Sequence, residues 1–209
     1  MASSSGDPLR IGLLSLQGAV ALHRPKLIRL GAEPVSVRAA EDLEQCAGLI
    51  VPGGESTTFL HLVKAYDLKA ALIDFAARAP VWGICAGSIL MAEKVENPPQ
   101  ESLGLMPVSI MRNAYGRQNE SFIATFPLRL PGRSPIDQEG VFIRAPRVTR
   151  WSEEVRVLGE HGGHPVVLQH GHHLLTTFHP ELSEADHLHS HFLESCRAAA
   201  QEARERSTA

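Results

Sequence analysis

The sequence lacks the features of a membrane protein or a nucleic-acid-binding protein. No apolar run among its 209 residues approaches the roughly 20 residues that a membrane-spanning helix needs. Lysine and arginine together number 20 and the acidic residues 23, so the formal net charge is -3 and no basic surplus favours DNA or RNA. Residues 1–8 also lack the basic start and apolar core of a signal peptide. We therefore expect a cytoplasmic protein with neither nucleic acid nor a membrane as partner.

Cysteine is scarce, and its spacing excludes two common roles. The chain has only Cys46, Cys85 and Cys196, an odd count without any C-x-x-C pair, which argues against a disulfide framework and a cysteine-based zinc site. Histidine is more plentiful, and His187 and His191 have the i, i+4 spacing that can chelate a metal on a helix. Since no third ligand stands at a matched distance, we expect solvated histidines, reduced thiols, no metal and no cofactor.

The first half of the chain alternates between strand-like and helix-like segments. Apolar stretches with strand character lie at residues 10–16, 34–37, 47–51 and 80–84, and helix-forming segments follow the first, third and fourth of them. Such an alternation is typical of a doubly wound parallel sheet.

The second half is richer in short β-prone pieces. They lie at residues 108–111, 121–130, 140–143, 155–158, 165–169 and 174–178. We expect these pieces to extend the main sheet as antiparallel strands, and a helix over residues 186–206 to close the chain. The predicted fold class is α/β, with a mixed, mostly parallel sheet flanked by helices. The length suits one domain over residues 10–203 after a flexible tail at residues 1–9.

Cys85 is the first candidate for a catalytic group because of the turn in which it lies. A strand-like segment leads into Gly83-Ile84-Cys85-Ala86-Gly87, and a helix-forming segment follows at once. In a nucleophile elbow the nucleophile sits where a strand ends and a helix begins, and flanking glycines relieve crowding. The positive end of the next helix favours the reactive thiolate. A buried structural cysteine beside a tight turn accounts for the same pattern.

Two further segments supply what a cysteine nucleophile needs. His179 follows the apolar stretch at residues 174–178, where α/β folds gather active-site groups, and Glu181 stands two residues on to orient its ring. In the segment 52–58, PGGESTT, the glycines let a backbone amide approach developing negative charge, so the amides of Gly54 and Ala86 can form an oxyanion hole. Ser56 or Thr57 can cap the next helix, and a Gly-Gly turn with such a cap is the simpler explanation of this segment.

Six segments together resemble the class I glutamine amidotransferases, and within them the glutaminase subunits of pyridoxal 5'-phosphate synthase. They are LQGAV at 16–20, PGGESTT at 52–58, GICAG at 83–87, RNAYGRQ at 112–118, GVFIRAP at 140–146 and FHPE at 178–181. The resemblance runs from about residue 10 to the last helix and implies a three-layer, flavodoxin-like sandwich.

The resemblance also implies a reaction. Cys85 attacks the side-chain amide of L-glutamine, His179 carries the proton to the departing ammonia, Glu181 holds His179, and water then hydrolyses the thioester. It further implies substrate contacts at Gln17, Gly54, Glu55, Ser56, Arg112, Ile143 and Arg144. An arginine suits the α-carboxylate because its guanidinium grips both oxygens, whereas a surface salt bridge is the alternative for Arg112 and Arg144.

The partner implied by the resemblance is a (β/α)8-barrel synthase subunit in a large hetero-oligomer, which uses the ammonia to make pyridoxal 5'-phosphate. Gln17 and the loops around it match the region near the partner interface. We expect low glutaminase activity until the partner docks and orders the Gly53 and Gly54 amides. Two alternatives stay open, a cysteine peptidase or other thiol hydrolase on the same scaffold, and an interaction subunit without catalytic activity.

Overall fold

The computed structural model describes residues 8–112 and 121–208. Most of the predicted tail and residues 113–118 of the RNAYGRQ segment lie outside the described residues. The sequence predicts Leu9 in the tail, but Leu9 begins the first strand, β1 (Leu9–Leu14), because it pairs in register with Ala32 of a neighbouring strand.

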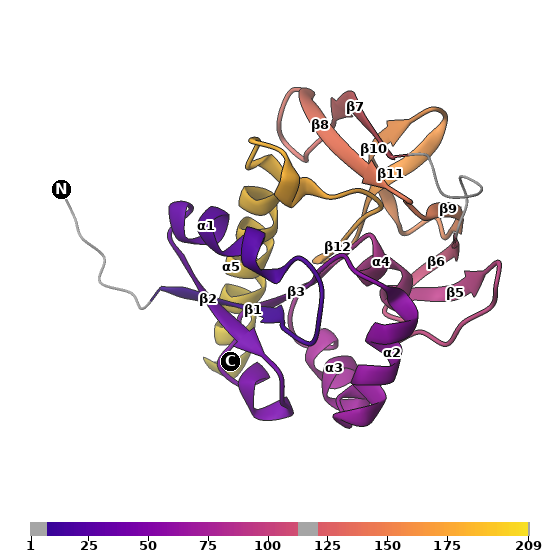
Figure 1. Cartoon of the computed structure of the whole chain (residues 1–209). Helices are drawn as coiled ribbons and strands as arrows, with labels where there is room; N and C mark the ends of the chain where they lie inside the picture. The colour runs from indigo at the N-terminus through magenta and orange to yellow at the C-terminus, as the bar shows by residue number, and fades with distance from the viewer. Residues whose placement is uncertain (1–7, 113–120, 209) are drawn as a thin grey trace.

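A mixed sheet of nine strands, counted over these described residues, forms the centre of the fold (Figure 1). Across the sheet the strands are β2 (Ala32–Val37), β1, β3 (Gly48–Val51), β4 (Val81–Ile84), β12 (His173–Thr176), β11 (His164–His170), β10 (Arg156–His161), β7 (Ser121–Leu128) and β8 (Ile136–Ile143). The strands from β2 to β12 run parallel, and from β11 onward each strand is antiparallel to the one before it. The predicted antiparallel extension of a parallel sheet is therefore present.

Helices cover both faces of the parallel strands, which gives the predicted three layers (Figure 1). One face carries α1 (Val20–Arg29) and α5 (His187–Thr208), and the other carries α2 (Ser56–Ala65), α3 (Lys69–Ala76) and α4 (Ala86–Met91). Two short 3-10 turns, η1 (Ala40–Leu43) and η2 (Pro180–Leu182), follow β2 and precede α5.

The strands divide their side chains between two cores, one under each helical layer. Ile50 of β3 packs in the same core as Phe192 of α5, whereas Leu49 and Val51 pack in the core that holds Phe59 of α2. All five side chains are fully buried. Successive residues of a strand point to opposite faces, so a continuous apolar run is what a strand between two helical layers requires.

A second, three-stranded sheet departs from the prediction. It consists of β5 (Ala92–Glu96), β6 (Met106–Met111) and β9 (Arg147–Trp151), in the order β5-β6-β9. The expectation that residues 108–111 extend the main sheet is wrong. Met106, Val108 and Ile110 bury one face of β6 in the core under α2 and α4. One-sided burial of this kind suits a sheet that covers a helical layer, because its other face meets no second layer.

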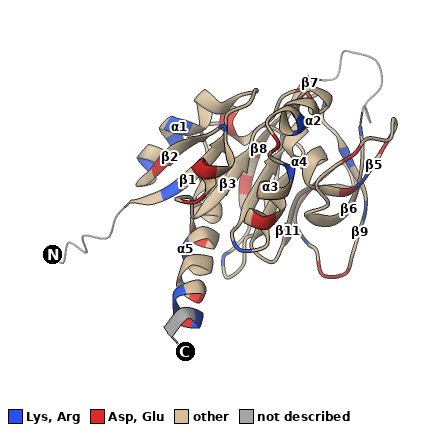
Figure 2. Cartoon of the chain, turned by 90° about the horizontal axis from the view of Figure 1, so that it is seen from below, with Lys and Arg blue, Asp and Glu red and all other residues tan. Residues whose placement is uncertain are grey.

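Within the described parts of the chain, no helix is both long enough and apolar enough to cross a membrane. The 22-residue α5 instead carries charged side chains of both signs toward its C-terminal end (Figure 2).

The packing of α5 on the sheet predicts a large stability effect at its centre. Phe192 is fully buried against β3 and β4, so Phe192→Ala is expected to lower the free energy of unfolding by about 3–5 kcal/mol. Ile28→Ala on α1 is the control, since Ile28 is 62% exposed and its loss should change stability by less than about 0.5 kcal/mol. Urea unfolding of both variants checks this, and equal effects would contradict the packing described.

Candidate active site

Cys85 stands at the junction of β4 and α4 in a backbone conformation that few side chains adopt. Its φ of 49° and ψ of -103° lie in a region that costs a non-glycine residue about 1–3 kcal/mol. Two hydrogen bonds hold it there. The Cys85 amide donates to the Thr176 carbonyl of β12 at 2.8 Å, and the Ser88 hydroxyl donates to the Cys85 carbonyl at 2.6 Å. The sequence-predicted elbow is thus formed by contacts with the neighbouring strand and the next turn.

The two glycines beside the elbow are required by close packing. A Cβ added at Gly87 would overlap the Val51 carbonyl oxygen of β3. One added at Gly83 would lie 2.6 Å from the Met91 sulfur and 2.7 Å from the Gly87 carbonyl oxygen. Any side chain at either position would therefore push α4, and with it Cys85, away from the sheet.

His179 lies three residues beyond β12, where several segments meet. Its amide donates to the Val141 carbonyl of β8 at 2.9 Å, which ties it to the far end of the sheet. Its ring lies against Gly53, so closely that a Cβ on Gly53 would overlap the ring. The PGGESTT loop and the His179 segment are therefore fitted to one another.

The His179 ring is paired with a buried carboxylate. Nδ1 of His179 and Oε1 of Glu181 are 2.7 Å apart, and the Glu181 side chain has no exposed surface. Burial by itself lowers the pKa of His179, but hydrogen bonds and charge interactions with Cys85 and Glu181 outweigh it and raise the pKa to about 10. The arrangement therefore favours the imidazolium form of His179 at neutral pH.

The helix that follows the PGGESTT loop is capped by Glu55 rather than by Ser56 or Thr57. The Glu55 carboxylate accepts hydrogen bonds from the Thr57 and Thr58 amides at 3.1 and 2.7 Å, whereas Ser56 is already helical. Partial burial opposes ionisation, yet these bonds lower the pKa of Glu55 to about 2. A glutamate can replace the shorter cap residues here because its carboxylate folds back over the first turn.

Gln17 holds the same loop from behind. Its Nε2 donates to the Glu55 carbonyl at 2.6 Å, its Oε1 accepts from the Glu55 amide at 3.5 Å, and its side chain lies against Gly54. The Ala19 amide adds a hydrogen bond to the Gly53 carbonyl at 3.3 Å. The backbone that carries the expected oxyanion donor Gly54 is thus fixed by the turn at the start of α1.

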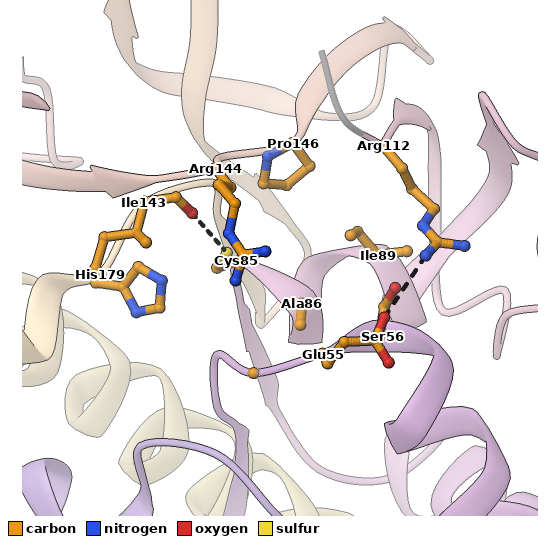
Figure 3. A pocket seen from close by; sticks show the side chains of 11 residues that line it. Glu55, Ser56, Cys85, Ala86, Ile89, Arg112, Ile143, Arg144, Pro146 and His179 are labelled. Atoms are coloured by element: carbon orange, nitrogen blue, oxygen red, sulfur yellow. Dashed lines mark hydrogen bonds and ion pairs between the residues drawn. The ribbon is translucent and has the colours of Figure 1, made fainter. Parts of the chain in front are cut away.

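These elements surround a cavity of about 380 Å³ (Figure 3). The lining residues are Gly54, Glu55, Ser56, Cys85, Ala86, Ile89, Arg112, Ile143, Arg144, Pro146 and His179. Every sequence-predicted site residue is among them except Gln17, which lies behind the loop, and Glu181, which lies behind His179. The Cys85 sulfur is 4.0 Å from the Ile143 carbonyl oxygen, so β8 closes the cavity opposite the loop.

The sequence over residues 13–198 matches the SNO glutamine amidotransferase family. The chain belongs to this family.

Proteins similar to this chain over most of its length support the same family assignment. A pyridoxal 5'-phosphate synthase subunit PdxT of Solibacter usitatus is 49% identical over 187 residues, which cover 88% of this chain and 97% of that protein. A subunit of the same name from Koribacter versatilis is 44% identical, over 90% and 96% of the two chains. A crystal structure of a glutamine amidotransferase, 40% identical, aligns with a TM-score of 0.82 and covers 89% of this chain and 98% of its own. The predicted family and fold class are confirmed.

Two arginines of this SNO-family chain enter the cavity in different ways. Arg112 donates from Nη2 to the Thr57 hydroxyl at 3.0 Å and lies 3.7 Å from the Glu55 carboxylate, so it is already anchored at the start of α2 (Figure 3). Arg144 is exposed and has a φ of 45°. Asp67, Cys85, Asn97 and Arg144 are the non-glycine residues with positive φ among those described, and two of the four line this cavity. Such backbone strain is concentrated at functional sites.

Two lining residues, Ile89 and Pro146, are not among the site residues predicted from the sequence. Ile89 lies four residues after Cys85, so helical spacing places it one turn beyond Cys85 on the same side of α4. That signal was available in the sequence. Pro146 follows Arg144 by two residues and carries no chemical signal of its own.

The His179–Glu181 pair predicts a titration that can be observed directly. We expect the His179 ring of the wild-type chain to titrate near pH 10. In Glu181→Gln the midpoint should fall below the wild-type value, because the charge of Glu181 is lost, while the interactions with Cys85 that also raise the pKa of His179 remain. Proton-carbon NMR of the histidine Cε1 signals measures this, with the His179 signal assigned from its loss in His179→Asn.

Glu184→Gln is the matched control for this titration, because Glu184 is exposed and lies on the same loop. It should leave the His179 midpoint in place. An unchanged midpoint in Glu181→Gln would contradict the account of the pair.

Proposed function

We propose that the chain hydrolyses L-glutamine to L-glutamate and ammonia through a thioester on Cys85, with His179 and Glu181 completing a catalytic triad. The observation that carries this proposal is the meeting of a strained cysteine elbow and a buried histidine–carboxylate pair at one cavity. Family membership supports the amide of glutamine as the group attacked.

The reaction follows from the residues in four steps. The Cys85 thiolate attacks the amide carbon, and the negative charge that develops on oxygen is stabilised by the Gly54 and Ala86 amides. The His179 imidazolium protonates the leaving nitrogen, so ammonia departs and the thioester forms. Neutral His179 then takes a proton from water as water attacks the thioester. Collapse of that intermediate expels the thiolate and releases glutamate, with Glu181 holding the ring throughout.

The charged groups of the cavity favour a free amino acid over a peptide. A free glutamine presents one carboxylate and one ammonium group beside its side chain. Arg112 and Arg144 suit the carboxylate and Glu55 suits the ammonium, whereas Ser56 and Ile143 complete the walls. An internal glutamine of a peptide carries neither charge, so its binding would leave Arg144 without a counter-charge from the substrate, whereas Arg112 and Glu55 already lie 3.7 Å from one another. This argues against the cysteine peptidase alternative.

A synthase partner is proposed from the relatives. The PdxT proteins at 49% and 44% identity are named as subunits of pyridoxal 5'-phosphate synthase. We infer that this chain passes its ammonia to a (β/α)8-barrel subunit of that synthase, within a large hetero-oligomer that makes vitamin B6. Direct transfer is chemically sensible because ammonia loses its nucleophilic lone pair when it is protonated in water.

Ammonia release from glutamine tests the proposal most simply. Cys85→Ala is expected to lose activity by roughly 10⁴-fold or more, both alone and with the synthase subunit, because the nucleophile is removed. Cys46→Ala is the matched control, since Cys46 is a buried free thiol whose sulfur contacts the Asp42 carbonyl, and it should keep wild-type activity.

Three outcomes would overturn parts of the proposal. Activity that survives in Cys85→Ala would contradict the thioester. An isolated chain that turns over glutamine as fast as the complex would contradict the expected activation by the partner. Failure of Cys85 to react with a glutamine-analogue affinity label would favour an interaction subunit without catalytic activity.

Arg144 provides a separate prediction about substrate binding. Loss of a charge-assisted hydrogen bond costs about 1.5–3 kcal/mol, so Arg144→Ala should raise KM for glutamine by roughly 10- to 150-fold and change kcat much less. The control is Arg150→Ala, an exposed arginine on β9 that does not line the cavity. Steady-state kinetics of the complex decides this, and an unchanged KM in Arg144→Ala would leave Arg144 with no part in binding the carboxylate.

A further inference from the structure

Glu181 has an oxygen that the proposed mechanism does not use. Oε1 is paired with His179, but Oε2 is buried and has no hydrogen-bond partner among the described residues. A carboxylate oxygen in this position is costly unless a positive or polar group faces it. The group that faces it is His23 of α1, whose Nε2 lies 3.9 Å from Oε2.

His23 is the first of two buried histidines in line behind Glu181. Its Nδ1 lies 3.0 Å from Nε2 of His189 on α5, and both residues are fully buried. The expectation of solvated histidines is therefore wrong for His189, and also for His191, which is 8% exposed. Trp82 packs edge-on against both imidazoles, with ring centroids 6.3 Å from His23 and 4.9 Å from His189. Trp82 belongs to β4, the strand that leads to Cys85, so the pair rests on the same scaffold as the nucleophile.

Both histidines are neutral in this position. Burial lowers the pKa of His23 to about 4. The charge of Glu181 opposes this shift, whereas the charges of His179 and Lys26 add to it. Burial also lowers the pKa of His189 well below its usual value. Charge interactions with His23, Lys26 and Arg29 lower it further. Lys26 itself is held by the Ser183 and Ala185 carbonyls and by Asp186.

Two neutral rings that share one hydrogen bond can place their protons in two ways. In the first, His189 donates from Nε2 to Nδ1 of His23, and His23 carries its proton on Nε2, directed at Glu181. In the second, His23 donates to His189 and turns a lone pair toward the carboxylate. Each arrangement leaves one buried ring N–H without a hydrogen-bond partner, on Nε2 of His23 in the first and on Nδ1 of His189 in the second. In the first that N–H faces the Glu181 carboxylate at 3.9 Å, whereas in the second a lone pair of His23 faces the negative charge, so electrostatics favours the first.

We propose that His23, fixed in its Nε2-protonated tautomer by His189, is a positioning residue that holds the Glu181 carboxylate toward His179. The distance of 3.9 Å is longer than a hydrogen bond, so here His23 acts as an N–H dipole aimed at Oε2. Hydrogen bonds of a catalytic unit often tighten only when substrate is bound. The inference rests on the proposed function of Cys85 and His179.

The tautomer of His23 can be measured without any turnover of glutamine. Nitrogen-15 NMR of the wild-type chain at pH 7 should show both His23 and His189 neutral and protonated on Nε2. Protonation of His23 on Nδ1 would overturn the proposal, whatever the enzyme's activity. Because this result does not depend on glutamine hydrolysis, it distinguishes a failure here from a failure of the proposed function.

Kinetics of the complex then tests the effect on the reaction. His23→Leu should lower kcat by about 10- to 100-fold with little change in KM, because the substrate-binding groups are untouched. His23→Gln should restore most of the rate, since its amide nitrogen stands near the position of Nε2. His172→Leu is the control, a half-buried histidine near Pro80 at the opposite end of β4 from Cys85, and it should behave as wild type.

A double variant separates positioning from a merely structural role. If His23 acts through Glu181, adding His23→Leu to Glu181→Gln should lower kcat little further. Losses that multiply, or a loss in His23→Leu that His23→Gln does not restore, would contradict the proposal. Urea unfolding of each variant identifies any that fails to fold, and for such a variant the wild-type tautomer decides the question.

Discussion

The close contact between β3, β4 and β12 at the start of α4 is the constraint on which the site depends. Gly87 packs against the Val51 carbonyl, and the Cys85 amide is bonded to Thr176, so the backbone at Cys85 has no room to relax to an ordinary conformation. The cost of about 1–3 kcal/mol is met by the two apolar cores that clamp these strands between helical layers. The strain turns Cys85 into the cavity, which His179, three residues beyond β12, also lines.

Electrostatics provides the second requirement. A buried carboxylate is unfavourable unless it is paired, and Glu181 is paired at 2.7 Å with a histidine whose imidazolium it stabilises. Behind the cavity, His179, Glu181, His23 and His189 follow one another as neighbours, and the last of them lies on α5. Elements distant in sequence thus contribute to one cluster of buried polar groups. The apolar layer around them excludes water and keeps these interactions strong.

Much of the fold and site could be predicted from the sequence because the signals were local. The elbow at Cys85, the strand before His179 and the Gly-Gly loop each follow from a few adjacent residues. The small sheet of β5, β6 and β9 could not be predicted, because one-sided burial at Ile110 depends on which helical layer the strand meets. The role of Glu55 as cap depends on a rotamer, and the alignment of His23 with His189 joins residues 166 apart. One histidine among 11 carries no signal of such a partner.

The central claim is that Cys85 carries the glutamyl group during the reaction. Acid quenching of the complex during turnover of glutamine, followed by peptide mass spectrometry, tests it most directly. The account predicts a γ-glutamyl adduct on the peptide that contains Cys85, and none on the peptides of Cys46 or Cys196, whose buried thiols have pKa values raised by burial. An adduct on either of those cysteines, or turnover without any adduct on Cys85, would contradict it.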